Sequence, residues 1–125
     1  MLVSVGGCSE GTSGAPSPTA ASSSALTFSS AEAGMRGLAA RMGCTPQTRG
    51  RPSDYRQAIC TTASGRYVIN TFDDEKGQRE WLRHSAMYGG TYLVGPRWVL
   101  VSTPRSLESA RGRLGGRVQS ARSVQ

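Results

Sequence analysis

The sequence predicts an α+β domain with a ferredoxin-like (split βαβ) order of elements. From residue 66 onward, the segments read as strand, helix, strand, strand, helix and a final short strand. Glycine pairs end both of these helices, and the predicted strand over residues 97–102 is apolar on both of its faces. This order predicts an antiparallel sheet with both helices on one face. An N-terminal helix and a hairpin strand should extend this unit, and the cysteine count below adds one disulfide.

The N-terminal helix is predicted over residues 29–42. Ser29 and Glu32 have the spacing of a capping box, and Gly43 follows the last helical residue. Three apolar residues fall on one face at helical spacing: Met35, Leu38 and Met42. The turn-rich segment 45–53 contains two prolines, so we expect a short edge strand there at most.

Two strands are predicted over residues 55–62 and 66–72, joined by the hairpin signal Ser64-Gly65. Asp73 is expected to cap the next helix, because aspartate at this position accepts hydrogen bonds from free backbone N–H groups. The glycine pair at 89–90 is expected to end that helix.

The next hairpin is predicted from residues 92–94 and 97–102, around a Gly95-Pro96 turn. Alternation places Trp98 and Leu100 on one face and Val99 and Val101 on the other, so both faces need a cover. We expect the helix of residues 29–42 to cover the second face. The alternative is a homodimer partner on that face.

A last helix should begin at Thr103-Pro104, because proline is tolerated in the first turn of a helix. Gly115-Gly116 should end it, and a weak strand signal follows at residues 117–120. We therefore predict a folded domain over residues 29–120 and a disordered tail over residues 121–125.

The net charge is +7, and 14 of the 15 basic residues are arginine. Arginine suits phosphate and carboxylate recognition, but a GC-rich coding bias produces the same excess without any function. The arginines are scattered along the chain, whereas a nucleic-acid interface is normally a basic patch or stripe. We therefore expect no nucleic-acid partner.

The chain has three cysteines, which leaves one without an intramolecular partner. If Cys8 carries a lipid, Cys44 and Cys60 remain to form a disulfide. That disulfide would close a loop of about 15 residues and stabilise the domain by roughly 3 kcal/mol. Two free thiols in a cytosolic protein are the alternative. A metal site is not expected, because His84 is the sole histidine and the cysteines lack zinc-ligand spacing.

Residues 8–28 are dominated by Ser, Thr, Ala, Gly and Pro, a composition that predicts a disordered tether about 25 Å long on average. Residues 1–7 are interpreted as the remnant of a signal peptide. They are too short to contain the apolar region of a complete signal, so we expect the true start to lie upstream.

The segment Val5-Gly6-Gly7-Cys8 resembles a bacterial lipobox, whose cysteine receives diacylglycerol. Residues 44–116 resemble a family of small actinobacterial exported lipoproteins with no established activity. The motifs that carry this resemblance are Cys60-Thr61, Gly65-Arg66-Tyr67, Thr71-Phe72, Gly77–Leu82, Tyr88–Val99 and Leu114–Gly116. The resemblance implies an exported protein with a lipid, such as palmitate, on Cys8.

The order of elements is also similar to that of SPOR-type wall-binding domains, which bind peptidoglycan glycans. The characteristic motif differs, because Ser102-Thr103-Pro104 stands where that family has Gly-Pro-Phe.

No catalytic motif is found, and neither a cofactor nor a metal is expected. His84 is interpreted as a solvated helix residue, and the acidic run 73–75 as charge at a helix start. The candidate binding surface comprises Trp98, Tyr92 and Arg97. We predict a binding or interaction module that is lipid-anchored through Cys8 on the extracytoplasmic face of the cell membrane and contacts an envelope protein or peptidoglycan. The alternatives are a SPOR-like glycan-binding module and a cytosolic basic nucleic-acid-binding protein.

Overall fold

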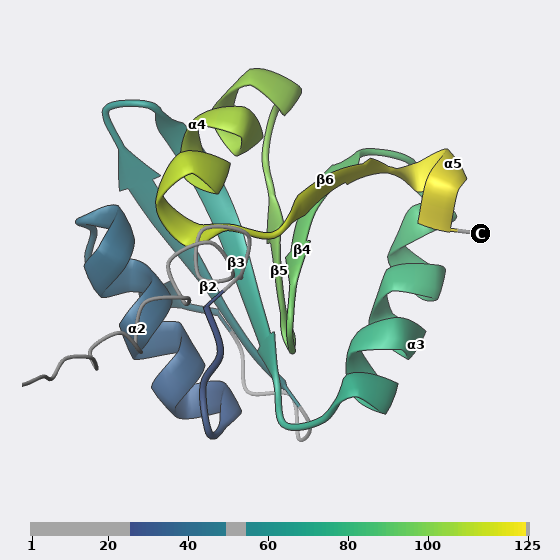
Figure 1. Cartoon of the computed structure of the whole chain (residues 1–125), viewed down its shortest axis with the longest axis horizontal. Coiled ribbons are helices and arrows are strands. Elements are labelled where there is room, and N and C mark those ends of the chain that lie inside the picture. Colours follow the sequence, from purple (N-terminus) through teal and green to yellow (C-terminus); the bar gives the residue numbers. More distant parts are fainter. Residues whose placement is uncertain (1–25, 50–54, 125) are drawn as a thin grey trace, which may run out of the picture.

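The computed structural model describes residues 26–49 and 55–124 (Figure 1). Cys8, the lipobox and residues 8–25 of the predicted tether lie outside the described residues. In chain order, the elements are α2 (Ala31–Met42), β1 (Gln47–Thr48), β2 (Tyr55–Thr62), β3 (Gly65–Phe72), α3 (Glu75–Ala86), β4 (Thr91–Gly95), β5 (Trp98–Val101), α4 (Pro104–Leu114), β6 (Arg117–Ser120) and α5 (Ala121–Val124).

The described strands form a six-stranded sheet in the order β1-β2-β3-β5-β4-β6, and every neighbouring pair is antiparallel. The α+β class and the antiparallel sheet are therefore confirmed. Strand β5 lies between β3 and β4, so β3, α3 and β4 form a split βαβ unit. The short edge strand β1 pairs with β2 at Gln47–Thr48, as the prolines around it predict.

The ferredoxin-like topology is not confirmed, because α3 and α4 lie on opposite faces of the sheet. Side chains of α4 pack with those of α2 in one cluster, whereas Leu82 and Trp81 of α3 pack in the other. Figure 1 shows α3 on the far side of the sheet from α2. The prediction that α3 and α4 share one face is therefore wrong.

The direction of the two crossovers explains this arrangement. The connections from β3 to β4 and from β5 to β6 both move two places toward the same edge of the sheet. Strands β3 and β5 run in opposite directions, so two crossovers of the same hand place their helices on opposite faces. Strand β6 consequently pairs with β4 at the far edge.

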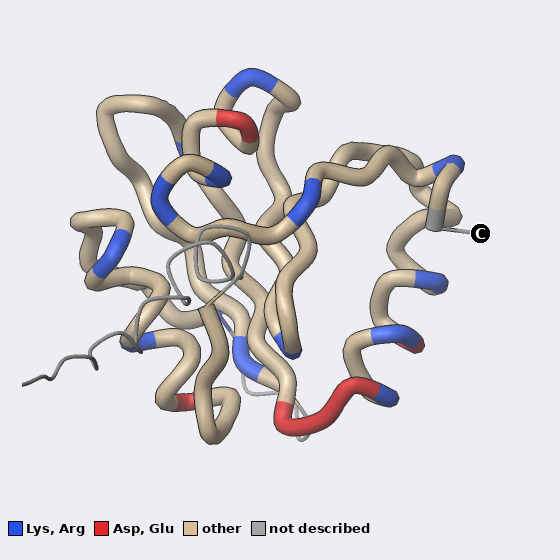
Figure 2. The backbone as a smooth tube through the Cα atoms, in the orientation of Figure 1, with Lys and Arg blue, Asp and Glu red and all other residues tan. Residues whose placement is uncertain are grey.

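Charged residues lie on the helices and toward the ends of strands, and β4 and β5 carry none (Figure 2). Two ion pairs form within the described residues, Arg36–Glu32 on α2 and Arg111–Glu108 on α4. Both pairs are exposed, and each contributes little to stability. The fold is therefore stabilised mainly by its apolar clusters and by the disulfide.

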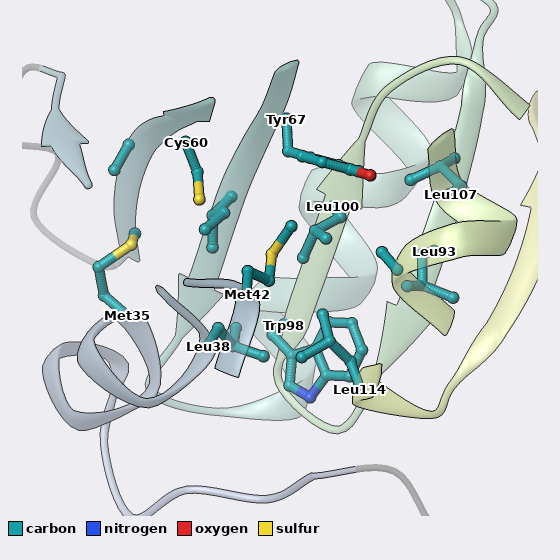
Figure 3. Packing of buried hydrophobic residues seen from close by; sticks show 13 residues of the cluster. Met35, Leu38, Met42, Cys60, Tyr67, Leu93, Trp98, Leu100, Leu107 and Leu114 are labelled. Carbon is teal, nitrogen blue, oxygen red and sulfur yellow. The ribbon is translucent and has the colours of Figure 1, made fainter. Parts of the chain in front are cut away.

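The larger apolar cluster fills the space between the sheet and the helices α2 and α4 (Figure 3). Trp98 and Leu100 of β5 point into it, as their alternation predicts, and both are fully buried. The other members that Figure 3 labels come from α2, α4 and the neighbouring strands: Met35, Leu38, Met42, Cys60, Tyr67, Leu93, Leu107 and Leu114.

The predicted disulfide is present between Cys44 and Cys60, whose Cα atoms are 5.8 Å apart. Gly43 ends α2 in the left-handed conformation with φ of 76°, which turns the chain toward the sheet. Cys60 lies on β2 and is completely buried. The disulfide thus joins the C-terminal end of α2 to the strand beneath it.

Two helix starts lie one residue later than predicted. The Oγ of Ser30, not that of Ser29, accepts the capping hydrogen bond from the Ala33 backbone N–H at 3.1 Å. Likewise Asp74, not Asp73, caps α3. The carboxylate of Asp73 instead accepts a hydrogen bond of 3.0 Å from the backbone N–H of Ala31, and so fixes the start of α2 to the end of β3.

The folded domain extends beyond both predicted boundaries. The Leu26 backbone N–H donates to the Leu114 carbonyl at 3.2 Å, and the Leu26 carbonyl accepts from Nε1 of Trp98 at 2.8 Å. Phe28 lies over Gly37, where a Cβ would overlap its ring. Residues 26–28 therefore belong to the domain, and residues 121–124, expected as a disordered tail, form α5.

Candidate functional site

The residues predicted as a binding surface do not share one. Trp98 and Tyr92 are 0% and 2% exposed, and they point to opposite faces of the sheet. Arg97 is half-buried in the turn between β4 and β5. The two aromatic residues are core residues, because α3 and α4 cover both faces at these positions.

Helix α3 covers only part of the second sheet face. Phe72, Tyr92 and Val99 of the sheet are buried beneath it, against Leu82 of the helix, whereas Val94 and Val101 remain half-buried. A hollow opens on each side of the helix. Helix α3 thus supplies part of the cover for this face. A homodimer contact on the face, the alternative to cover by a helix, stays a prediction.

The larger hollow lies between α3 and the far edge of the sheet. Strands β4 and β6 and the short helix α5 form its other side. Two adjoining cavities of about 610 and 370 Å³ share Arg79, Leu82, Arg117 and Gln119. Arg83 of α3 and Ser123 of α5 complete the smaller cavity. We call these six residues together the arginine cleft.

The turn that connects β4 to β5 forms one wall of the larger cavity, and Gln78 holds this turn in place. Nε2 of Gln78 donates to the carbonyl oxygens of Gly95 at 2.7 Å and Trp98 at 3.1 Å. Its Oε1 accepts from the backbone N–H of Arg97 at 2.9 Å. All the polar atoms of this buried amide are therefore used by the protein itself.

Arg97 has a φ of 63°, which is the sole positive value among the described non-glycine residues. Such a conformation costs about 1–2 kcal/mol for a residue with a Cβ. Three contacts maintain it: the one to Gln78, a bond from Nη1 of Arg97 to the Asp73 carbonyl at 3.2 Å, and one from the Phe72 N–H to the Arg97 carbonyl at 2.9 Å. Hydrogen bonds from α3, the end of β3 and the loop after it thus hold this wall of the larger cavity.

Two glycines allow the backbone to pack closely beside the cleft. A Cβ at Gly95 would overlap the Trp98 ring. A Cβ at Gly116, whose φ is 89°, would lie 2.7 Å from the carbonyl oxygen of Val94. The glycine pair that ends α4 therefore also lets β6 pair with β4 next to the bulky indole ring.

The three arginines of the cleft make no ion pair with any residue that the structure describes. With the amide of Gln119 oriented with its oxygen toward Arg117, that oxygen accepts from Nε at 2.6 Å and Nη2 at 3.2 Å. Figure 2 shows basic positions along α3 and on the facing β6 and α5. The cleft is therefore a positively charged hollow, in which Leu82 is the one apolar residue.

The hollow on the other side of α3 has a volume of about 280 Å³ and is mainly apolar. We call it the aromatic groove, and its lining residues are Gln57, Val68, Trp81, Ser85, Tyr88, Gly89, Tyr92 and Val101. Helix α3 ends at Ala86, earlier than the glycine pair predicts. Tyr88 and Met87 consequently leave the helical face and are 79% and 71% exposed.

Burial raises the pKa of the Tyr92 phenol above its usual value near 10. Its hydroxyl donates a hydrogen bond of 2.8 Å to the carbonyl oxygen of Gly89. The protonated phenol therefore fixes the chain just after α3, at the floor of the aromatic groove.

Within residues 26–49 and 55–124, no cluster of three or more His, Cys, Asp or Glu side chains has the arrangement of a metal site. None of the helices in these ranges combines the length and apolar character needed to cross a membrane. Comparison of the chain with protein-family models, with curated proteins and with solved structures gives no match.

Sequence reasoning missed the arginine cleft because its halves are distant in the chain. Arg79 and Arg83 are four residues apart on a predicted helix, so the sequence alone indicates that they share one helix face. Arg117 joins them only because β6 pairs with β4, at the edge that α3 faces. The ferredoxin-like expectation gave no reason to place it there.

Proposed function

We propose that this chain is a lipid-anchored extracytoplasmic protein that acts as a binding module at the cell envelope, with Cys8 as the site of lipid attachment. The pairing of Cys44 with Cys60 carries the proposal. It leaves Cys8 as the one cysteine of the sequence outside the disulfide. Disulfides persist in oxidising extracytoplasmic compartments, and the lipobox-like sequence before Cys8 agrees with export.

Binding is the activity that the two hollows beside α3 support. The arginine cleft offers hydrogen-bond donors and positive charge, and the aromatic groove offers aromatic rings with polar groups at its rim. Both hollows have walls held by secondary structure, so a ligand would meet a preorganised surface.

Fractionation of cells that express Cys8→Ser tests the anchor. Two acyl chains hold a protein stably on a bilayer, whereas the unmodified chain has no such attachment. The wild-type protein should sediment with membranes, and Cys8→Ser should move to the soluble or medium fraction with its disulfide intact. Ser13→Ala, a change in the same segment, is the matched control and should stay with membranes. Retention of Cys8→Ser on membranes contradicts the anchor.

Recognition of wall glycans is a second candidate, favoured by the exposed Tyr88 beside Trp81 in the aromatic groove. Aromatic rings provide flat apolar surfaces, and Gln57 and Ser85 add hydrogen-bonding groups at the same site. Tyr88→Ala should weaken retention of the protein on purified peptidoglycan. Met87→Ala, equally exposed but outside the groove lining, should not. Equal retention of all three proteins contradicts this candidate.

A further inference from the structure

We propose that the arginine cleft binds a phosphate group carried by a soluble ligand. This inference rests on the proposed role as a binding module and adds the chemical class of its ligand. Its test uses purified protein without the lipid, so a failure of the cleft and a failure of the anchor give different results.

The positions of the three arginines support a shared ligand. Arg79 and Arg83 are one turn apart on α3, and Arg117 approaches from β6 on the opposite side. All three line the same cavity of about 370 Å³, which opens into the adjoining cavity of about 610 Å³. The space between them is large enough for a phosphate and part of the group that carries it.

The charge of the cleft favours an anionic ligand. None of the three guanidinium groups pairs with a carboxylate of the described residues, and Glu75 is the one acidic residue that lines either cavity. Positive charge in a hollow with low-dielectric walls concentrates the field and attracts anions. Elsewhere on the domain, Arg36 and Arg111 pair with glutamates, whereas other exposed arginines such as Arg105 form no ion pair with the described residues; what sets the cleft apart is that three arginines line one cavity.

The arrangement of the arginines favours phosphate over carboxylate. A tetrahedral phosphate presents oxygens in several directions, whereas a carboxylate presents two in one plane. The guanidinium groups on α3 and on β6 approach from different directions. They suit a phosphate, because each planar fork can bond a different pair of phosphate oxygens. With its amide oxygen toward Arg117, Gln119 accepts from Nε and Nη2 of that arginine and leaves three of the five guanidinium N–H donors for a ligand.

The shape of the site favours a soluble ligand over a lipid headgroup in a bilayer. The arginines line a hollow bounded by α3 on one side and by the sheet edge on the other. A ligand must enter this hollow to reach all three. A basic surface that projects from the protein would contact the headgroups of a flat bilayer more readily than a hollow does.

Titration of the ¹⁵N-labelled full chain, made soluble by Cys8→Ser, tests the proposal. The probes are inorganic phosphate and glycerol 3-phosphate, with sodium chloride at matched ionic strength as the reference. We expect saturable amide shifts around residues 79–83 and 117–119. Arg79→Gln and Arg117→Gln should each weaken binding about tenfold, the usual effect of losing a charge-assisted hydrogen bond.

Arg105→Gln is the matched control, since it removes the same charge from an exposed arginine of α4 outside the cleft. Arg83→Gln provides a third cleft variant, and amide dispersion reports whether each variant is folded. Absence of saturable shifts overturns the proposal, as does equal weakening by Arg105→Gln. Binding of the same protein to phosphatidylglycerol vesicles, but not to either soluble phosphate, also overturns it and assigns the cleft to the membrane surface.

Discussion

The side-chain oxygen of Gln78 accepts a hydrogen bond of 2.9 Å from the backbone N–H of Arg97 and so connects α3 to the β4–β5 turn. The same amide donates to the carbonyl oxygens of Gly95 and Trp98. Gln78 is 6% exposed, so water has little access to these groups. One buried side chain therefore links α3 directly to the turn and contributes to holding both in place.

Replacement of this amide should destabilise the domain. Gln78→Ala leaves one N–H and two carbonyl groups without their partner, and we expect the free energy of unfolding to fall by about 2–4 kcal/mol. Urea denaturation followed by tryptophan fluorescence measures the change. Gln47→Ala on the exposed edge strand β1 is the control, with an expected change within about 0.5 kcal/mol. A loss below about 1 kcal/mol for Gln78→Ala would show that the turn does not depend on this amide.

The positive φ of Arg97 predicts a specific order of substitutions. Asparagine tolerates this conformation, so Arg97→Asn should leave stability within about 0.5 kcal/mol of the wild type. A β-branched residue does not, so Arg97→Val should destabilise by about 1–2 kcal/mol more. Both variants lose the hydrogen bond to the Asp73 carbonyl, so their difference isolates the backbone effect. Equal stabilities, measured by thermal unfolding, would contradict the role assigned to this residue.

Local patterns in the sequence were sufficient to predict most elements of the fold. The β-branched and aromatic alternation at 98–101 predicted correctly which side chains face each cluster, and the cysteine count predicted the disulfide. Where two capping residues stand side by side, as at Ser29-Ser30 and Asp73-Asp74, local chemistry does not decide between them. Tertiary contact does: Asp73 is recruited by the start of α2, which leaves Asp74 to cap α3.

The order of the strands depends on long-range pairing that local periodicity does not encode. Strand β6 has two residues of intermediate burial and a weak pattern, so its sequence does not specify pairing with β3 or with β4. That choice determines which face α4 covers. Leu26 and Phe28 were likewise assigned to the tether from composition. In the structure, the Leu26 carbonyl accepts a hydrogen bond from the buried Trp98, and the Phe28 ring lies over Gly37 of α2.

The disulfide should contribute a large share of the stability of the domain. It closes a loop across a sequence separation of 16 residues, and removing this constraint should lower the free energy of unfolding by roughly 3 kcal/mol. Denaturation of the same protein before and after reduction measures this difference without any cavity from a substitution. Cys8→Ser should unfold like the wild type in both states. Equal stability of the oxidised and reduced forms would contradict the prediction.

Stability should fall in alkaline solution because of Tyr92. Burial raises the pKa of this phenol in the folded state, so the unfolded chain loses its proton first as the pH rises above about 10. The contribution of the protonated Tyr92 to the free energy of unfolding is fully present below about pH 10 and decreases above it. Tyr92→Phe should lower stability at pH 7 by about 1 kcal/mol, through loss of the bond to Gly89, and should flatten the alkaline decrease. Tyr88→Phe, which changes an exposed phenol, is the control. If stability falls equally in alkaline solution for Tyr92→Phe and the wild type, groups other than Tyr92 cause the decrease.

The intact mass of the protein, purified from a bacterial host that lipidates exported cysteines, tests the proposed envelope role most directly. We expect a diacylglyceryl group on Cys8 as the first residue of the mature chain, together with the loss of two hydrogens at Cys44 and Cys60. Proteolytic fragments should assign each modification to its cysteine. An unmodified N-terminal segment with Cys8, Cys44 and Cys60 all present as free thiols would contradict the account.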